Sequence, residues 1–293
     1  MSENQDILVE LNNDELQELV QMYYPHKRKF HVIYSFLQTS LKSKSVHGME
    51  DFVQIYSPNG SWRYDGTFIA SMPSHGHDIV AHSLDPSGKN LTDGLKFTKR
   101  FKFGANSSRD YTLFYAIHEQ FSSKIAEVFT ETTNYEVEFD EVEMWALDQE
   151  EALTFTSKDW EIPAAYIEEM VSSEITLINS VWPHRYRDSE NKHRDWLTVG
   201  LGYGVHLKST GNLVAWVKTS CLGQLCALQT LEEYKRRGYA AALIKRMSYE
   251  LAKTDLDPCA LVTLENTASK NLMKKLGFKK LYNCVFIGVF NKK

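Results

Sequence analysis

The sequence lacks the features that mark membrane and secreted proteins. No apolar run approaches the roughly 18 residues that a membrane-spanning helix needs. The first six residues, Met1 to Asp6, are acidic and carry neither the basic stretch nor the apolar core of a signal peptide. We therefore expect a soluble intracellular protein with no membrane partner, located in the cytoplasm or, as the alternative, in mitochondria.

Cysteine and clustered histidine are also scarce. The four cysteines, Cys221, Cys226, Cys259 and Cys284, form no Cys-x-x-Cys pair, and no His-x-x-x-His lies near them, which disfavours a zinc site. Histidine is concentrated only at His75, His77 and His82, without a nearby acidic or thiol partner. We expect buried free thiols and no metal.

A strong net charge of either sign is missing as well. The formal net charge of -5 gives no overall attraction to nucleic acid, so we expect no nucleic-acid partner, and any site for a polyanion must be built locally. The Gly-x-x-x-x-Gly-Lys-Ser/Thr and Gly-x-Gly-x-x-Gly nucleotide loops are both absent. The 293 residues, 43% hydrophobic and 12% aromatic, are typical of a folded chain with two medium-sized domains.

The first half of the sequence predicts a mixed α/β domain over residues 1–148. Apolar spacing predicts helices at 13–24, 29–42, 91–103 and 118–130. Residues 52–84 read as an antiparallel meander with strands at 52–56, 61–64, 67–72 and 78–84, and 135–146 reads as an exposed strand. The acidic segment 148–159 is the expected boundary, although residues 152–156 could instead form the first strand of the second domain.

The second domain, residues 149–293, shows a clearer rhythm. A helix is expected at 164–180, where Trp182-Pro183 stops it, followed by a further element at 197–204. Strands are then predicted at 205–208, 213–219, 224–231, 260–264 and 283–290, with helices at 238–253 and 269–276. From residue 205 on, the order of elements is βββαβαβ.

The short basic turn before the helix at 238–253 is the most informative segment. The first N–H groups of a helix lack partners within it, and the positive end of the helix dipole lies there, so an anion is favoured. Gly238 would let the backbone approach phosphate oxygens, and Tyr239, Ala240 and Ala241 open the helix. Lys235, Arg236 and Arg237 oppose the dipole unless an anion binds. The alternative is that they are solvated charges at a helix start.

Two motifs in this half resemble a known family. The run Lys-Arg-Arg-Gly-Tyr-Ala at 235–240 is similar to the Arg/Gln-x-x-Gly-x-Gly/Ala acyl-coenzyme A motif of the GCN5-related N-acetyltransferase (GNAT) superfamily. Residues 266–278, from Asn266 to Phe278, resemble its second signature, Asn-x-x-Ala-x-x-Leu-Tyr-x-Lys-x-Gly-Phe. Residues 211–216 are similar to the FR47-like branch, which includes the glycine N-acyltransferases. The first 150 residues carry no recognised motif.

This resemblance implies a fold, a co-substrate and roles for residues. It implies a mixed, mostly antiparallel sheet flanked by helices in the C-terminal half, and acyl-CoA or acetyl-CoA as co-substrate. Leu228, Gln229 and Thr230 would pair with the pantetheine arm, while residues 235–241 hold the pyrophosphate. Asn266 would lie near the amide arm of the cofactor, and Ser269, Leu272 and the residue at Met273 would face the cofactor. Asn266 could instead merely cap its helix.

Three departures from the family pattern bear on catalysis. Lys235 takes the usual Arg/Gln place and loses the forked donor of arginine. Met273 stands where many relatives carry a tyrosine acid, and Gln224 stands where glycine N-acyltransferases have a glutamate base. A glutamine cannot take a proton, so substitute bases are sought at His206, Glu232 and Glu265. Cys226 could line the pocket or act as a buried apolar residue.

These features favour an acyl-CoA-dependent N-acyltransferase whose acceptor is a small amine, such as the amino acid glycine. One alternative is an acyl-CoA-binding regulatory protein with little catalysis, and another is a protein N-acetyltransferase. We expect the N-terminal half to complete an α/β body and to cover one side of the acceptor pocket. A second, degenerate acyltransferase-like half is one form that it could take.

Overall fold

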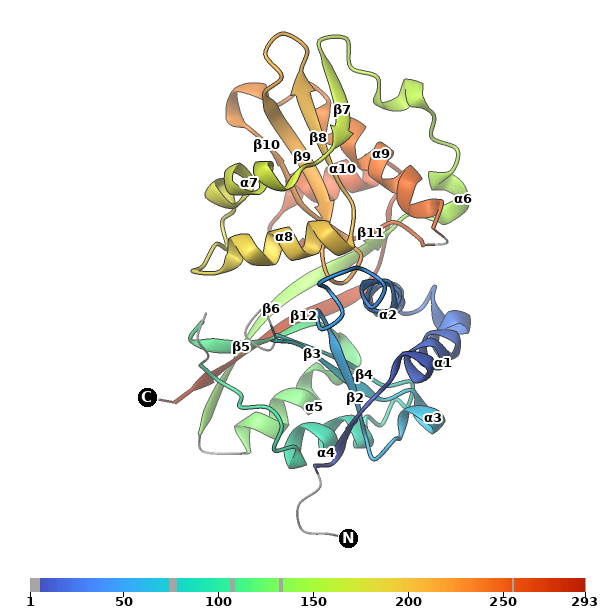
Figure 1. Cartoon of the computed structure of the whole chain (residues 1–293), viewed down its shortest axis with the longest axis vertical. Helices are drawn as coiled ribbons and strands as arrows, with labels where there is room; N and C mark the ends of the chain where they lie inside the picture. Colours follow the sequence, from blue (N-terminus) through green and yellow to red (C-terminus); the bar gives the residue numbers. More distant parts are fainter. Residues whose placement is uncertain (1–5, 74–77, 106–108, 132–133, 255, 293) are drawn as a thin grey trace.

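One long sheet connects the two halves of the molecule (Figure 1). The structure, a computed structural model, describes residues 6–73, 78–105, 109–131, 134–254 and 256–292, and within them the sheet has twelve strands in the order β1-β2-β3-β4-β5-β12-β6-β11-β10-β9-β8-β7. The strands are β1 Leu8–Glu10, β2 Gln54–Pro58, β3 Phe68–Met72, β4 Asp78–His82, β5 Tyr111–His118, β6 Tyr135–Ala146, β7 Ala165–Glu169, β8 Gly202–Leu207, β9 Leu213–Thr219, β10 Leu225–Thr230, β11 Cys259–Thr263 and β12 Lys279–Asn291.

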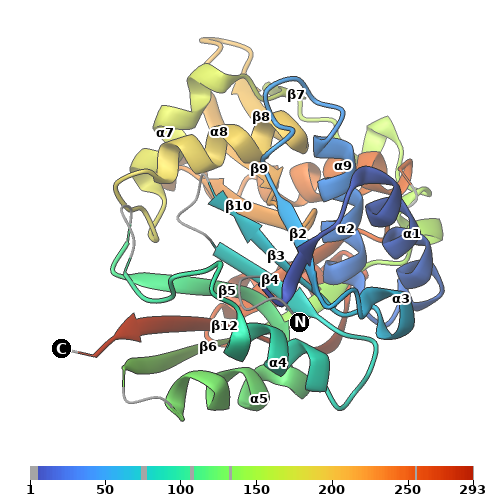
Figure 2. The same cartoon turned by 60° about the horizontal axis from the view of Figure 1, so that its bottom comes forward.

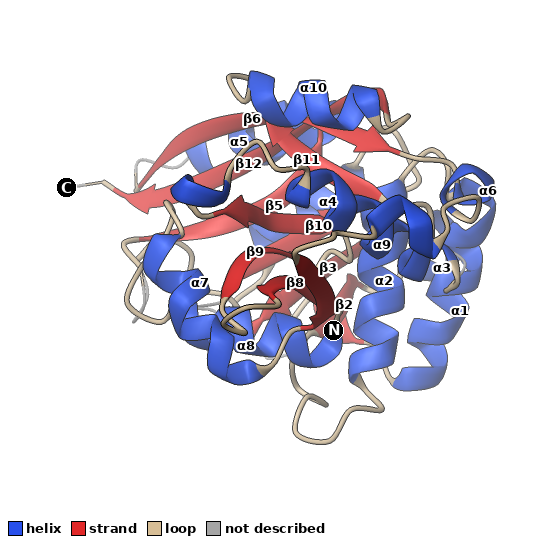
Figure 3. Ribbon diagram, turned by 90° about the horizontal axis from the view of Figure 1, so that it is seen from above, coloured by secondary structure: helices blue, strands red, loops and turns tan. Residues whose placement is uncertain are grey.

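Helices pack around this sheet (Figure 3). They are α1 Asn13–Tyr23, α2 His31–Ser43, α3 Trp62–Asp65, α4 Lys89–Phe97, α5 Glu119–Thr130, α6 Gln149–Ala152, α7 Ile175–Val181, α8 Ser189–Val199, α9 Tyr239–Ala252 and α10 Thr267–Lys275. Helices α4 and α5 lie side by side in the N-terminal half (Figure 2). Helix α9 packs its apolar face, with Leu243, Met247 and Leu251 buried, against β8, β9 and β10.

The strand order reads alike from both ends of the sheet. Most neighbouring strands are antiparallel, but β4 pairs parallel with β5 at Ile79 and Phe114, and β10 pairs parallel with β11 at Leu225 and Ala260. These two parallel pairs hold the same place when the sheet is counted inward from β1 or from β7. The two halves of the chain therefore have the same strand plan.

Each half contributes its last strand to the other half. β12, from the end of the chain, lies between β5 and β6, and β6, from the N-terminal half, lies between β12 and β11. β6 and β12 run antiparallel, from Lys279 opposite Ala146 to Asn291 opposite Tyr135. The C-terminus consequently lies in the N-terminal half (Figure 1). The acidic side chains of β6 are exposed at Glu136, Glu138, Asp140 and Glu141, as expected of an exposed strand. Glu143 is instead buried and forms ion pairs with Lys270 and Lys280, both at 3.1 Å.

The elements after residue 205 agree closely with expectation. The predicted βββαβαβ order is confirmed by β8 to β12 with α9 and α10, and the strand predicted at 213–219 is β9. In the N-terminal half the predicted helices at 13–24, 29–42 and 118–130 are confirmed as α1, α2 and α5. Asn12 caps α1 by accepting hydrogen bonds from the Asp14 and Glu15 N–H groups, both at 3.0 Å.

Several predicted elements were wrong. The helix expected at 164–180 is strand β7 followed by α7, because alternating residues of an edge strand also satisfied helical spacing. The strand expected at 61–64 falls on the short helix α3. The alternative first strand at 152–156 begins at the last residue of α6 and is not a strand. The helix expected at 91–103 is α4, which ends at Phe97, and β5 was not predicted.

Candidate functional site

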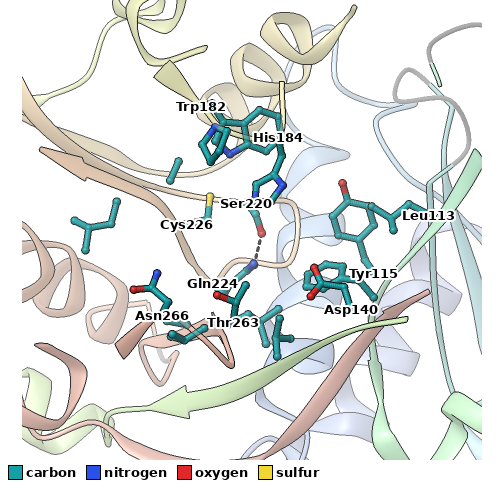
Figure 4. A pocket seen from close by; sticks show the side chains of 18 of the residues that line it. Leu113, Tyr115, Asp140, Trp182, His184, Ser220, Gln224, Cys226, Thr263 and Asn266 are labelled. Atoms are coloured by element: carbon teal, nitrogen blue, oxygen red, sulfur yellow. Dashed lines mark hydrogen bonds between the residues drawn. The ribbon is translucent and has the colours of Figure 1, made fainter. Parts of the chain in front are cut away.

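A cavity of about 640 Å³ lies between the two halves. β5, β6 and β12 line one side of it, and the other side is formed by β10, β11, α10 and the α7–α8 segment. Figure 4 shows Tyr115 and Asp140 on the side of the N-terminal half, with Gln224 and Cys226 across from them. The cavity therefore exists because the chain folds as two halves sharing one sheet.

A bulge in β10 exposes backbone at this cavity. Ala227 has φ +52°, and the pairing of β10 with β9 shifts register between Cys226 and Gln229. A bulge leaves one residue unpaired and re-aims its neighbours. Leu228 and Gln229 line the cavity, whereas Thr230 pairs with Ala215 and is not among the lining residues. Because β10 meets β11 at Leu225 and Ala260, the backbone of the bulge has room for an extended ligand on the β11 side.

The basic turn follows β10 and leads into α9. Gly238 has φ +83° and is the residue before the helix, where no side chain of the described residues caps the first N–H groups. Arg236 also has a positive φ, +65°. These backbone angles bring the turn tightly onto the helix start, and the uncapped N–H groups with the positive helix dipole form a place that favours an anion.

The charged side chains of this turn lie at the surface. Lys235 forms an ion pair with Glu232 at 2.6 Å, and Arg237 donates to the Glu233 carbonyl at 3.0 Å. Lys235, Arg236, Arg237 and Gly238 are exposed, Ala240 and Ala241 are half-buried, and Tyr239 is buried in the core. Tyr239 could therefore contribute its backbone N–H to a ligand but not its ring. None of these turn residues lines the cavity within the described part of the chain.

Helix α10 closes the same side of the cavity. Asn266 caps it, its Oδ1 accepting from the Ser269 N–H at 3.0 Å, so the capping role is observed. Asn266, Ser269 and Met273 nevertheless all line the cavity, and Met273 is buried. The Asn266 amide nitrogen is the part of that side chain left to donate toward a ligand.

The candidate bases lie in different places. Gln224 is buried at the cavity and accepts a hydrogen bond from the Ser220 hydroxyl. His206 is not among the cavity residues; its Nε2 lies 2.6 Å from Glu174 Oε1, and its ring stacks on Tyr166. Glu232 and Glu265 are exposed and do not line the cavity either. Of the four, the structure brings only Gln224 to the cavity.

Sequence reasoning missed a set of buried polar residues beside the cavity, drawn from both halves of the chain. We call Asp78, Arg109, Tyr115, Lys192 and Lys218 the buried cluster; all five are buried. Asp78 forms ion pairs with Arg109 and, at 3.2 Å, with Lys192, which also donates to the Tyr115 hydroxyl. These residues come from four strands or helices and one loop, so no local spacing in the sequence indicates the cluster.

Burial dominates the acid–base behaviour of this region. It lowers the pKa of Lys192 to about 7, with the Arg109 charge acting in the same direction, and it lowers the pKa of Lys218 to about 8. Burial also raises the pKa of Tyr115 well above its ordinary value and that of Cys221 to about 12. The Cys221 thiol therefore stays protonated at neutral pH, whereas Lys192 can lose its proton there and Lys218 loses its own at about one pH unit higher.

Metal binding has no support in the described residues. His75 and His77 lie outside them, and His82 is buried with its Nδ1 2.8 Å from the Tyr23 hydroxyl. Within residues 6–73, 78–105, 109–131, 134–254 and 256–292, no cluster of three or more histidine, cysteine, aspartate or glutamate side chains could hold an ion. No helix in those same ranges is both long and apolar enough to cross a membrane.

Comparisons with known proteins agree with this architecture. Residues 202–287 match the model of the FR47-like protein family, and residues 7–128 match a family described as a domain of unknown function, DUF5645. No curated protein sequence matches the chain. The X-ray structure of a Drosophila protein, 21% identical, is similar over 97% of this chain and 98% of that one, with a TM-score of 0.84.

Two further solved structures share the fold at lower identity. A putative acetyltransferase from Pyrococcus horikoshii is 10% identical over 100% of this chain and 93% of that one, with a TM-score of 0.54. A tandem GNAT protein from the clavulanic acid biosynthesis pathway is 8% identical over 97% and 98%, with a TM-score of 0.50. Residues 202–287 are thus similar to the FR47-like family, and the chain as a whole shares its fold with solved structures of GCN5-related N-acetyltransferase type.

Proposed function

We propose that this protein transfers an acyl group from acyl-CoA to the amine of a small acceptor, with an amino acid such as glycine as a candidate. The observation that carries the proposal is the bulge in β10, beside β11, followed along the chain by the uncapped start of α9. A pantetheine arm could pair with the backbone of Leu228 and Gln229, and the pyrophosphate could lie on the N–H groups after Gly238.

The N-terminal half supports a small acceptor over a polypeptide. β5, β6 and β12 wall the cavity on the side away from β10 and α10, and aromatic side chains such as Tyr111, Phe286 and Phe290 line it there. A walled cavity of this size holds a small molecule more readily than an extended chain. Catalysis would then rest mainly on positioning the amine and on N–H groups that stabilise the oxyanion.

We further propose that residues 1–148 and 149–293 are two halves of one design, the first of them without a cofactor site. Gly88, with φ +63°, precedes α4 as Gly238 precedes α9. At this first turn, however, the Asp85 carboxylate accepts from the Ser87 N–H at 2.9 Å, and a side chain at Gly88 would meet the Phe121 ring at 3.0 Å. A carboxylate and an aromatic ring therefore lie at this turn.

A second candidate function is acyl-CoA binding with little catalysis. Gln224 and Met273 line the cavity where the resembling enzymes have a proton acceptor and a proton donor. An amide and a thioether cannot exchange protons at neutral pH. A regulatory protein that senses acyl-CoA would need the bulged strand β10 and the start of α9 to bind it, but neither a proton acceptor nor a proton donor.

Two measurements separate these functions. Acetyl-, benzoyl- and long-chain acyl-CoA, and free CoA, should raise the Tm of the protein by mass action; no shift with any of them would contradict both functions. Release of the CoA thiol with a panel of amino acids and simple amines should then occur. Binding without thiol release across the panel would favour the regulatory protein.

A further inference from the structure

The buried cluster contains more cations than anions. Asp78 supplies one carboxylate, while Arg109, Lys192 and Lys218 supply three basic groups, and the Lys192 side chain is only 2% exposed. Arginine stays protonated in proteins, so the ion pair with Arg109 already balances the Asp78 charge. Lys192 shares the Asp78 carboxylate with this arginine, and burial of a lysine whose charge is only partly balanced favours loss of its proton.

Lys192 lies at the cavity beside Tyr115, where its neutral amine could accept a proton. Both Lys192 and Tyr115 line the cavity, and the Lys192 Nζ is hydrogen-bonded to the Tyr115 hydroxyl. When Lys192 is an amine, its lone pair can accept from the Tyr115 O–H, and the phenol oxygen can then accept from a group in the cavity. Gln224 and Ser220 line the same cavity, with Tyr115 on its opposite side (Figure 4).

We propose that Tyr115 and Lys192 form the proton relay that takes a proton from the acceptor's ammonium group. The inference rests on the proposed acyl transfer, and it supplies the proton acceptor that Gln224 cannot provide. Tyr115 would be the catalytic residue, touching the acceptor nitrogen, while Lys192 acts through it.

The proton balance of the step is complete. The ammonium gives one proton to the Tyr115 oxygen as the Tyr115 O–H proton passes to Lys192 Nζ. The free amine then attacks the thioester carbonyl; the C–N bond forms, and the C–S bond breaks with its electron pair on sulfur. The second nitrogen proton neutralises the thiolate, and Lys192 later releases its proton to solvent.

Several ionisable groups share this environment and bear on its pH dependence. Those facing Lys192 or Tyr115 from neighbouring elements are Asp78, Arg109, Tyr111, Tyr186, Lys218, Cys221 and Cys226. Helix α8 itself carries Glu190, His193, Arg194 and Asp195, and Asp188 directly precedes it. The Arg109 charge and burial both favour the neutral amine of Lys192, with a pKa of about 7. Lys218, with a pKa of about 8, titrates in an overlapping range and does not line the cavity.

The pH dependence of kcat/KM tests the relay. For the intact protein, kcat/KM should rise as the pH passes through about 7, since Lys192 must be neutral to accept a proton. Lys192→Arg keeps the positive charge beside Asp78 but cannot act as a base. Its kcat/KM should fall by about 10²- to 10⁴-fold and should no longer rise as the pH passes through about 7. Tyr115→Phe should show the same loss of kcat/KM and of its pH dependence, whereas in Lys218→Met kcat/KM should still rise through about pH 7. All variants should retain the Tm shift with CoA.

Other outcomes would overturn the relay. In one such outcome, kcat/KM of Lys192→Arg still rises with pH and is reduced less than tenfold. In the other, the pH at which kcat/KM rises changes with the amine pKa of the acceptor, which would assign the rise to the acceptor and not to Lys192. If Lys192→Arg does not fold, Lys192→Met gives the same comparison. If the unaltered protein binds acyl-CoA but releases no thiol with any amine, both the proposed acyl transfer and the relay are wrong. If the unaltered protein is active and Lys192→Arg has the same pH dependence of kcat/KM, only the relay is wrong.

Discussion

Lys218 is a fully buried amine, and the groups nearest to it are uncharged. Its Nζ lies 3.9 Å from Cys226 Sγ, 3.5 Å from the Thr219 carbonyl oxygen and 4.2 Å from the centre of the Trp196 ring. Within the described residues it makes no ion pair with a carboxylate. Burial lowers its pKa from 10.5 to about 8, so below pH 8 the folded protein bears the cost of a buried charge.

Lys218→Met should therefore stabilise the protein, and most strongly at low pH. The folded pKa lies below the unfolded one, so the unfolded chain binds more protons between about pH 8 and 10.5, and the penalty fades as the pH rises through that window. At pH 7 the gain should approach about 3 kcal/mol, at 1.36 kcal/mol for each unit of pKa. Urea unfolding at pH 7 and pH 9.5 measures it.

The exposed Lys99 offers the matched control, because Lys99→Met removes the same charge from the surface. It should change the free energy of unfolding by less than about 0.5 kcal/mol at both pH values. A Lys218→Met gain that is equal at pH 7 and 9.5 would contradict the lowered pKa and point instead to packing.

Single residues also show how far sequence could lead to the site. The family resemblance indicated Leu228, Gln229, Asn266 and Ser269, and all four line the cavity because they lie in a bulged strand and at a capped helix start. The buried cluster could not be foreseen, since its members lie far apart in sequence and meet only through tertiary packing. His206 was a candidate base from its place in the sequence, but its pairing with Glu174 depends on the fold of residues 172–174.

At the scale of single elements, the start of α9 depends on a left-handed residue. Gly238 has φ +83°, and a side chain there would meet nothing within 4 Å, so a substitution strains the backbone without a clash. Gly238→Val should cost about 1–2 kcal/mol of stability and should shift the N–H groups of the helix start. We expect the Kd for CoA, measured by calorimetry, to rise at least tenfold.

Gly211 provides a control of the same kind at another turn. It has φ +72° in the turn between β8 and β9, and a side chain added there would also meet nothing within 4 Å. Gly211→Val should lose similar stability and keep the affinity for CoA. Equal affinity in both variants would mean that the turn at 235–238 does not hold the cofactor.

Elements were predictable where local signals agreed with tertiary packing. α9 has a continuous apolar face and a glycine before it, and its predicted range differs from the observed one by one residue at each end. β7 was mistaken for a helix because Ile167, Met170 and Val171 satisfy helical spacing, although Ala165–Glu169 pairs along β8. β5 was missed because the residues from Leu113 to Ile117 are all apolar and do not alternate with polar residues. Such a run is typical of a strand that is buried on both faces.

For the whole molecule, the exchange of β6 and β12 makes the halves depend on each other. β12 lies between two strands of the N-terminal half, and β6 lies between two strands of the C-terminal half. Neither half can leave without exposing backbone groups on strands that are buried in the sheet. No sequence signal indicated the exchange, because strand partners far apart in the chain are chosen by packing.

The halves should therefore stay together after the chain is cut between them. A protease site inserted after Leu153, an exposed residue beyond α6, would allow cleavage of the folded protein near residue 153. The two fragments should co-elute in size-exclusion chromatography without denaturant and should keep the Tm shift with CoA, with the uncut insertion variant as reference. Calorimetry of the uncut chain should give one transition with equal calorimetric and van't Hoff enthalpies. Fragments that separate in buffer, or two transitions in the uncut chain, would mean that the sheet joins two independently stable domains, because interlocked strands can be released only by unfolding both halves.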